Sequence, residues 1–153
     1  MRCMNCYVIE GHDSAAKTPI AEGVAARLQR AGLRAMVVAV FHLAKDQLGH
    51  DIEALWQSEE TAVQAITLLK KLLRQHTDAA MRAGCDVLLF DRHWMTVLTE
   101  IRTSPRLMEE WGGDYPPTFV IRTSPEKTLA AKSRKPELPW LKSEEVVRDY
   151  HGR

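Results

Sequence analysis

Residues 6–18 read C-Y-V-I-E-G-H-D-S-A-A-K-T, and this stretch decides how the rest of the chain is interpreted. The run over residues 6–10 is short and apolar and ends at Gly11, which is typical of a buried strand. From Lys17 onward apolar side chains recur at helical spacing, and Gly32 stands where a left-handed C-terminal cap belongs. We therefore predict a strand, a tight turn and a helix. The apolar positions expected to define the helix are Ile20, Val24, Leu28 and Ala31.

The alternation of strand and helix continues along the chain. Further short apolar runs predict strands at residues 34–41, 86–90 and 118–122. Helical spacing and capping residues predict helices at residues 58–84, 94–101, 124–131 and 144–150. Between them, we expect residues 42–57 to be largely loop with some helix, and a loop to lead through Pro117. The order predicts an α/β domain in three layers, with a parallel sheet of about four strands flanked by helices and ligands bound at the carboxyl ends of the strands.

Composition narrows the class of protein. The 153 residues are 45% apolar and 27% charged, which fits one domain over residues 1–153. Lysine and arginine number 21 against 20 acidic residues, so we expect neither a nucleic-acid partner nor a membrane partner. Apolar runs are too short to span a bilayer and no signal region is evident, which predicts a cytoplasmic location.

Two of the three cysteines, Cys3 and Cys6, form a C-x-x-C pair. Such a pair can be half of a zinc site or a redox couple, but no second pair at ligand spacing completes it. We favour reduced thiols beside the first strand and leave the metal and redox alternatives open.

Residues 11–18 match the phosphate-binding pattern G-x-x-x-x-G-K-[ST], except that Ala16 replaces the second glycine. Amides of the turn and the helix N-terminus would hold phosphate oxygens of ATP, Lys17 would reach the β and γ phosphates, and Thr18 would ligate Mg²⁺. The alternative is an ordinary strand-turn-helix with an exposed lysine. The predicted cofactor-binding residues are Gly11, Asp13, Ser14, Ala15, Ala16, Lys17 and Thr18.

Two departures from the pattern predict weaker phosphate binding. Ala16 carries a Cβ where glycine allows a closer approach, and Pro19 has no backbone N–H to donate. Losing one hydrogen bond to a charged group lowers affinity roughly tenfold to a hundredfold.

Three segments together resemble the thymidylate kinase family of P-loop nucleoside monophosphate kinases. Y-V-I-E-G-H-D-S-A-A-K-T resembles the opening of that family, and D-V-L-L-F-D-R-H-W-M-T resembles its D-R-[YH]-x-x-[ST] motif. The looser third segment is P-P-T-F-V-I-R-T-S-P-E-K-T-L, which in the family leads to an arginine-bearing lid. The segments occur in the family's order over about 130 of the 153 residues.

The resemblance implies transfer of a phosphoryl group from ATP to dTMP or a related nucleotide with Mg²⁺. It implies catalytic roles for Lys17, Asp91, Arg92 and Arg134. It implies acceptor contacts from Asp13, Arg92 and Thr96, and Mg²⁺ contacts from Thr18 and Asp91. Relatives that form homodimers make a homodimer possible here.

Other interpretations stay open. Considered without the phosphate-binding pattern at residues 11–18, Asp91 and Arg92 would be interpreted as an ion pair. Arg134 lies in the basic segment at residues 132–142, which is either a lid or a solvated cluster of charges. Lys70 or a neighbouring leucine stands where the family reads thymine with an arginine, and the chain reaches Arg153 where the family continues into a fifth strand. The rivals are a non-catalytic or weakened nucleotide-binding relative and a deoxynucleoside kinase.

Overall fold

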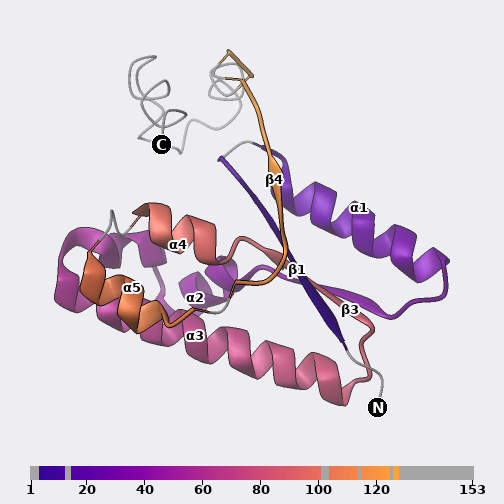
Figure 1. The fold of residues 1–153 in the computed structure, drawn as a ribbon, viewed down its shortest axis with the longest axis horizontal. Helices are drawn as coiled ribbons and strands as arrows, with labels where there is room; N and C mark the ends of the chain where they lie inside the picture. Colours follow the sequence, from indigo (N-terminus) through magenta and orange to yellow (C-terminus); the bar gives the residue numbers. More distant parts are fainter. Residues whose placement is uncertain (1–3, 13–14, 101–103, 114, 125, 128–153) are drawn as a thin grey trace.

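The computed structural model describes residues 4–12, 15–100, 104–113, 115–124 and 126–127 (Figure 1). Its strands are β1 (Asn5–Gly11), β2 (Ala35–Val38), β3 (Val87–Asp91) and β4 (Thr118–Ile121). Its helices are α1 (Lys17–Arg30), α2 (Val40–Leu48), the 3₁₀ helix η1 (Ile52–Gln57), α3 (Glu59–Arg82), α4 (Trp94–Glu100) and α5 (Pro105–Trp111).

The four strands form one parallel sheet in the order β2-β3-β1-β4. β1 is central, and its Val8 lies opposite Phe90 of β3 and Thr118 of β4. Because all strands run the same way, the carboxyl ends of β1, β3 and β4 meet at one edge. The loop after Gly11 and the turn after Asp91 therefore leave the sheet side by side.

Helices cover both faces of the sheet (Figure 1). On one face Ala25 of α1 packs with Val87 and Leu89 of β3. On the other face Leu88 and Phe90 belong to a larger core built mainly on α2 and α3. The alternation of side chains along β3 supplies both cores at once, which is why that strand is apolar at four successive positions. The three-layer α/β architecture predicted from the sequence is confirmed.

The long helix α3 has the ends that the sequence predicts. Ser58 accepts a hydrogen bond from the backbone N–H of Thr61 and forms a capping box with it. After the last turn Gly84 is left-handed, with φ of 69°, and Cys85 N–H donates to Ala80 O at 2.9 Å.

Three expectations are wrong in detail. The strand predicted at residues 34–41 is shorter, because Val40 and Phe41 form the buried first turn of α2; an apolar run cannot distinguish a buried strand from a buried helix. The region 42–57 is mostly helical, and α5 lies inside the predicted loop, starting with Pro105 at a first-turn position and ending at a left-handed Gly112.

The buried face of α1 also differs from the prediction. Its buried side chains are Lys17, Ala21 and Ala25, whereas Ile20 and Val24 are 39% and 37% exposed. Small residues allow α1 to lie close to the sheet, so size decides which face is buried.

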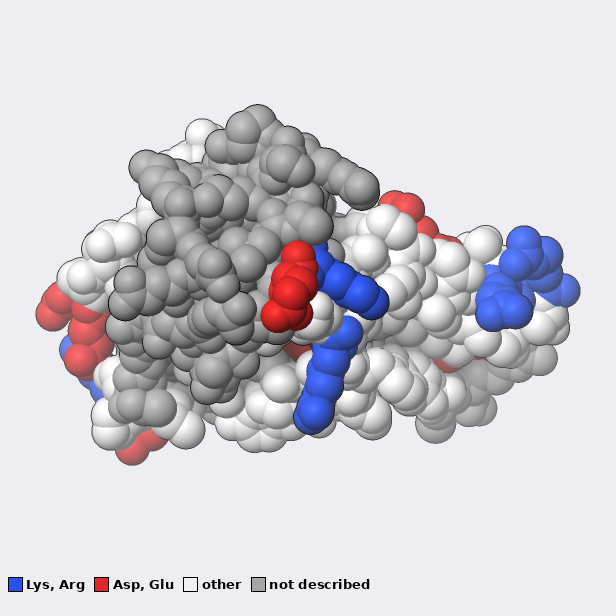
Figure 2. Space-filling model, turned by 90° about the horizontal axis from the view of Figure 1, so that it is seen from above, with Lys and Arg blue, Asp and Glu red and all other residues white. Residues whose placement is uncertain are grey.

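Charge is spread without a dominant sign on the face that Figure 2 presents, where described basic and acidic side chains form small separate groups. None of the helices in the described part of the chain combines the length and apolarity needed to cross a bilayer.

Candidate functional site

The turn that follows β1 can only begin with glycine. Gly11 has φ of 148°, and a Cβ placed there would come within 2.5 Å of the backbone oxygen of Ile121 on β4. Backbone cannot move aside as a flexible side chain does, so the neighbouring strand excludes every larger residue. This contact fixes where the loop leaves the sheet.

The loop re-enters α1 through a left-handed alanine. Ala16 has φ of 55° and ψ of 35°, a conformation that glycine adopts without cost and that alanine adopts at about 1–2 kcal/mol. The N–H of Ala15 donates to His12 O at 3.1 Å, which closes the turn. Alanine is thus strained into a backbone conformation that favours glycine, at the position where the phosphate pattern has its second glycine.

Lys17 turns back over this loop instead of extending into solvent. Its side chain is 6% exposed, and Nζ donates to the backbone oxygen of His12 at 2.8 Å. A buried ammonium is costly unless its donors are satisfied, so the loop carbonyl holds the charge close to the turn. Lysine is exposed in most folded proteins; here the amine is inside the loop that was predicted to bind phosphate.

Thr18 and Asp91 meet across the carboxyl edge of the sheet. The Thr18 hydroxyl donates to Oδ2 of Asp91, which is buried at the end of β3. A hydroxyl and a carboxylate are hard oxygen donors of the kind that Mg²⁺ takes together with waters and phosphate oxygens. The two residues predicted to share a metal ion are therefore adjacent, and their donor atoms suit it.

Arg92 occupies the turn directly after β3. Its φ is 69°, and its N–H donates to Ile9 O at 3.0 Å. Its guanidinium lies 3.4 Å from a carboxylate oxygen of Glu53 and 5.8 Å from the centre of the Phe41 ring. These contacts direct the side chain toward η1 and α2, while its backbone directly follows Asp91.

Glu10 is a buried carboxylate that sequence reasoning missed. It is 2% exposed, and its two oxygens accept hydrogen bonds from His93 and Thr96. Thr96, for which the resemblance implies an acceptor contact, donates its hydroxyl to Glu10. The signal was present, because an acidic residue inside an apolar strand has to find donors. For Glu53, by contrast, the mixed polarity of its region gave no such signal.

His93 is buried between aromatic rings. Its ring centroid lies 5.0 Å from that of Phe90 and 5.4 Å from that of Trp111. Burial lowers the pKa of His93 from 6.5 to about 4. Nδ1 has no hydrogen-bond partner among the described residues. The side chain is therefore a neutral core group at pH 7.

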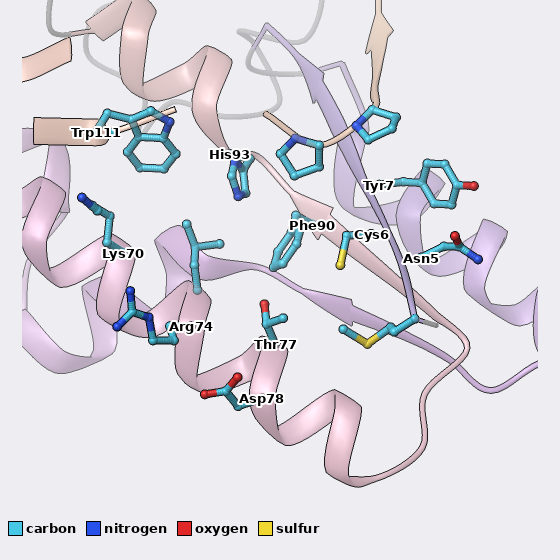
Figure 3. A pocket seen from close by; sticks show the side chains of 15 residues that line it. Asn5, Cys6, Tyr7, Lys70, Arg74, Thr77, Asp78, Phe90, His93 and Trp111 are labelled. Atoms are coloured by element: carbon cyan, nitrogen blue, oxygen red, sulfur yellow. The ribbon is translucent and has the colours of Figure 1, made fainter. Parts of the chain in front are cut away.

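Figure 3 shows His93 and Trp111 at one end of a cavity of about 710 Å³. The cavity continues along Leu73 and Thr77 of α3 to Met4 at the start of β1. It therefore lies against the face of the sheet, whereas the loop and the Thr18–Asp91 pair lie at its carboxyl edge.

Several predicted residues fall outside the described part of the chain. They are Asp13, Ser14, Arg134 and the basic segment 132–142, together with Cys3, residues 125 and 128–131 of the helix expected at 124–131, and the helix expected at 144–150. The structure brings together Gly11, Ala15, Ala16, Lys17, Thr18, Asp91 and Arg92 at one edge of the sheet.

Comparisons with known proteins support the fold and go no further. No protein-family model matches the chain, and no curated protein does. The solved structure of shikimate kinase from Acinetobacter baumannii in complex with shikimate is similar, with a TM-score of 0.55 and 17% identity over 97% of this chain and 74% of that chain.

Two other solved structures are less similar in shape. APE1195 matches with a TM-score of 0.47 and 21% identity, over 92% of this chain and 76% of its own. A DNA replication initiation factor matches with a TM-score of 0.37 and 16% identity, over 96% of this chain and 49% of its own. At these scores neither supports an inference. The shikimate kinase likeness and the parallel sheet together show a three-layer α/β fold similar to that of the shikimate kinase.

Proposed function

We propose that this protein is a P-loop phosphotransferase that moves the γ-phosphoryl group of ATP to a nucleoside monophosphate. The observation that carries the proposal is the arrangement of Lys17, Thr18 and Asp91, with a buried amine over the loop and a hydroxyl–carboxylate pair beside it. Phosphoryl transfer is chiefly positioning and charge compensation, and this set supplies both.

On the donor side, Lys17 and the amides of the loop would hold the phosphates of ATP. The amine would exchange its His12 carbonyl for phosphate oxygens, which are stronger acceptors because they are charged. Thr18 and Asp91 would hold Mg²⁺, which would supply positive charge to offset that of the phosphate oxygens.

On the acceptor side, Arg92 would engage the monophosphate. Its planar guanidinium can meet two phosphate oxygens at once, and the turn after β3 places it next to Asp91. In the proposed step an acceptor phosphate oxygen bonds to the γ-phosphorus while the bond to the β–γ bridging oxygen breaks, so ADP leaves. The thymidylate kinase resemblance names dTMP as the first acceptor to test.

The rest of the assignment rests on the resemblance alone. We propose one catalytic domain over residues 1–153, with residues 132–142 as a lid and Arg134 offsetting charge in the transition state.

A coupled assay of ADP formation tests the proposal. It offers ATP and Mg²⁺ with dTMP, dUMP, CMP, AMP and GMP, and adds thymidine and shikimate as acceptors of other classes. Lys17→Ala is expected to lower turnover at least about hundredfold, since it removes a charge-assisted contact that strengthens in the transition state. Lys71→Ala, at an exposed lysine of α3, is the matched control and should leave turnover unchanged. Absence of transfer to every monophosphate by folded protein refutes the proposal.

One observation favours a second candidate, a nucleotide-binding relative that does not transfer phosphate. Alanine occupies the left-handed position of the loop, and Pro19 in the first turn of α1 offers no N–H. Calorimetry with ATP and Mg²⁺ separates the two: binding without transfer identifies the relative, and binding with transfer the kinase.

A further inference from the structure

The carboxylate of Glu10 binds the segment that follows β3. Oε1 accepts from His93 N at 2.7 Å and from Thr96 N at 3.2 Å, and Oε2 accepts from Thr96 Oγ1 at 2.7 Å. A buried carboxylate is stable only when donors surround it. All three donors come from two residues on either side of the start of α4.

These bonds fix the backbone of Arg92. The amide before its Cα, Arg92 N, donates to Ile9 O at 3.0 Å, and the amide after it, His93 N, donates to Glu10. When the peptide groups on both sides of a Cα are held, φ and ψ at that residue are determined. Arginine is not a residue that adopts φ of 69° readily, so the conformation depends on such restraints.

The same carboxylate holds the first turn of α4. Thr96 N and Thr96 Oγ1 both donate to it, so Glu10 satisfies a backbone N–H near the helix N-terminus that has no partner within α4. Helix and turn are thereby attached to β1 as one unit.

We propose that Glu10 is a positioning residue that aims Arg92 at the acceptor phosphate, a role that rests on the proposed function. Glu10 immediately precedes Gly11, so one end of one strand sets both the donor loop and the acceptor arginine. Glu10 itself has no place among the phosphate contacts; it acts through the Arg92 backbone.

Calorimetry with acceptor and donor measured separately tests this role. Wild type, Glu10→Ala, Glu10→Asp and Glu10→Gln are titrated with dTMP, dUMP, CMP, AMP and GMP, and independently with ATP and Mg²⁺. Glu10→Ala is expected to weaken binding of the acceptor at least about tenfold and of ATP less than about threefold. Glu10→Gln keeps an amide oxygen for the two N–H groups, and Thr96 Oγ1 can accept from its NH₂, so it should restore acceptor binding to within about threefold.

A double-mutant cycle with Arg92→Ala separates positioning from general loss of structure. If Glu10 acts through Arg92, adding Glu10→Ala to Arg92→Ala leaves acceptor affinity unchanged within about twofold. If Glu10→Ala does not fold, as judged by circular dichroism, Glu10→Asp is measured in its place, since the shorter side chain withdraws the carboxylate and should give the same selective loss.

The outcomes are distinct. Equal weakening of ATP and acceptor, additive effects in the cycle, or an unchanged acceptor affinity in Glu10→Ala would each overturn the positioning role while leaving the proposed function intact. Failure of the wild type to bind any monophosphate would overturn the proposed function, and the positioning role with it.

Discussion

Replacing Ala16 with glycine should stabilise this protein, although the same replacement destabilises most helices. The left-handed conformation of Ala16 costs about 1–2 kcal/mol for alanine and nothing for glycine. Glycine loses about 0.5–1 kcal/mol more backbone entropy on folding, which leaves a net gain of about 0.5–1 kcal/mol. Removing the Cβ also lets the loop approach phosphate more closely, so the dissociation constant for ATP with Mg²⁺ should fall by up to about tenfold.

Ala26→Gly is the matched control, because Ala26 lies in the middle of the same helix with ordinary helical backbone. Glycine loses the same extra backbone entropy at this position, but the alanine there has no backbone strain to relieve. The free energy of unfolding of this variant should therefore fall by about 0.5–1 kcal/mol. The difference between the two variants isolates the left-handed cost. Urea unfolding should separate them by about 1–2 kcal/mol, or roughly 2–8 °C in Tm. If Ala16→Gly is destabilised as much as Ala26→Gly, the loop does not have this backbone and the reasoning fails.

Three further predictions concern stability. Gly11→Ala should lower the free energy of unfolding by at least about 2 kcal/mol, because the added Cβ clashes with Ile121 O. Gly23→Ala, which has nothing within 4 Å of the added Cβ, should raise it by about 0.5–1 kcal/mol. Equal effects of the two variants in urea unfolding would contradict the clash. The unfolded chain binds a proton at His93 more readily than the folded chain does, because burial lowers the pKa of this side chain. The free energy of unfolding should therefore be fully present above pH 6.5 and fall by up to about 3 kcal/mol as the pH drops toward 4. His93→Phe should not show this loss. Ser58→Ala should lower the free energy of unfolding by about 1 kcal/mol, as measured by thermal unfolding. If stability is unchanged, the capping box does not stabilise the helix.

Glu10 and Gly11 show how closely donor and acceptor sides of the proposed site are joined. Glu10 is attached through its carboxylate to the segment that follows β3, and Gly11, which has no side chain, lies against β4. Together the two residues attach the end of β1 to the segment after β3 and to β4. This explains why a single strand end can organise a site whose side chains come from distant parts of the sequence.

The sequence by itself determined the class of fold and the edge of the sheet at which the candidate site lies. Short apolar runs in the strands and a period of 3.6 in the helices, with Gly32 and Gly84 at helix ends, depend on local backbone preferences that any short segment already contains. The sequence also placed Gly11 and Asp91 at one edge, because parallel strands bring their carboxyl ends together, whereas the contact of Thr18 with Asp91 is seen in the structure.

Only the tertiary structure decided which faces are buried and which groups hold the site together. Whether Val40 and Phe41 extend a strand or start a helix, and whether α1 buries Ala21 or Ile20, depends on the space left by distant neighbours. The partnership of Glu10 with Thr96 joins residues 86 positions apart. Periodicity reports what a segment prefers, whereas burial of a charge is permitted only by donors that folding brings to it.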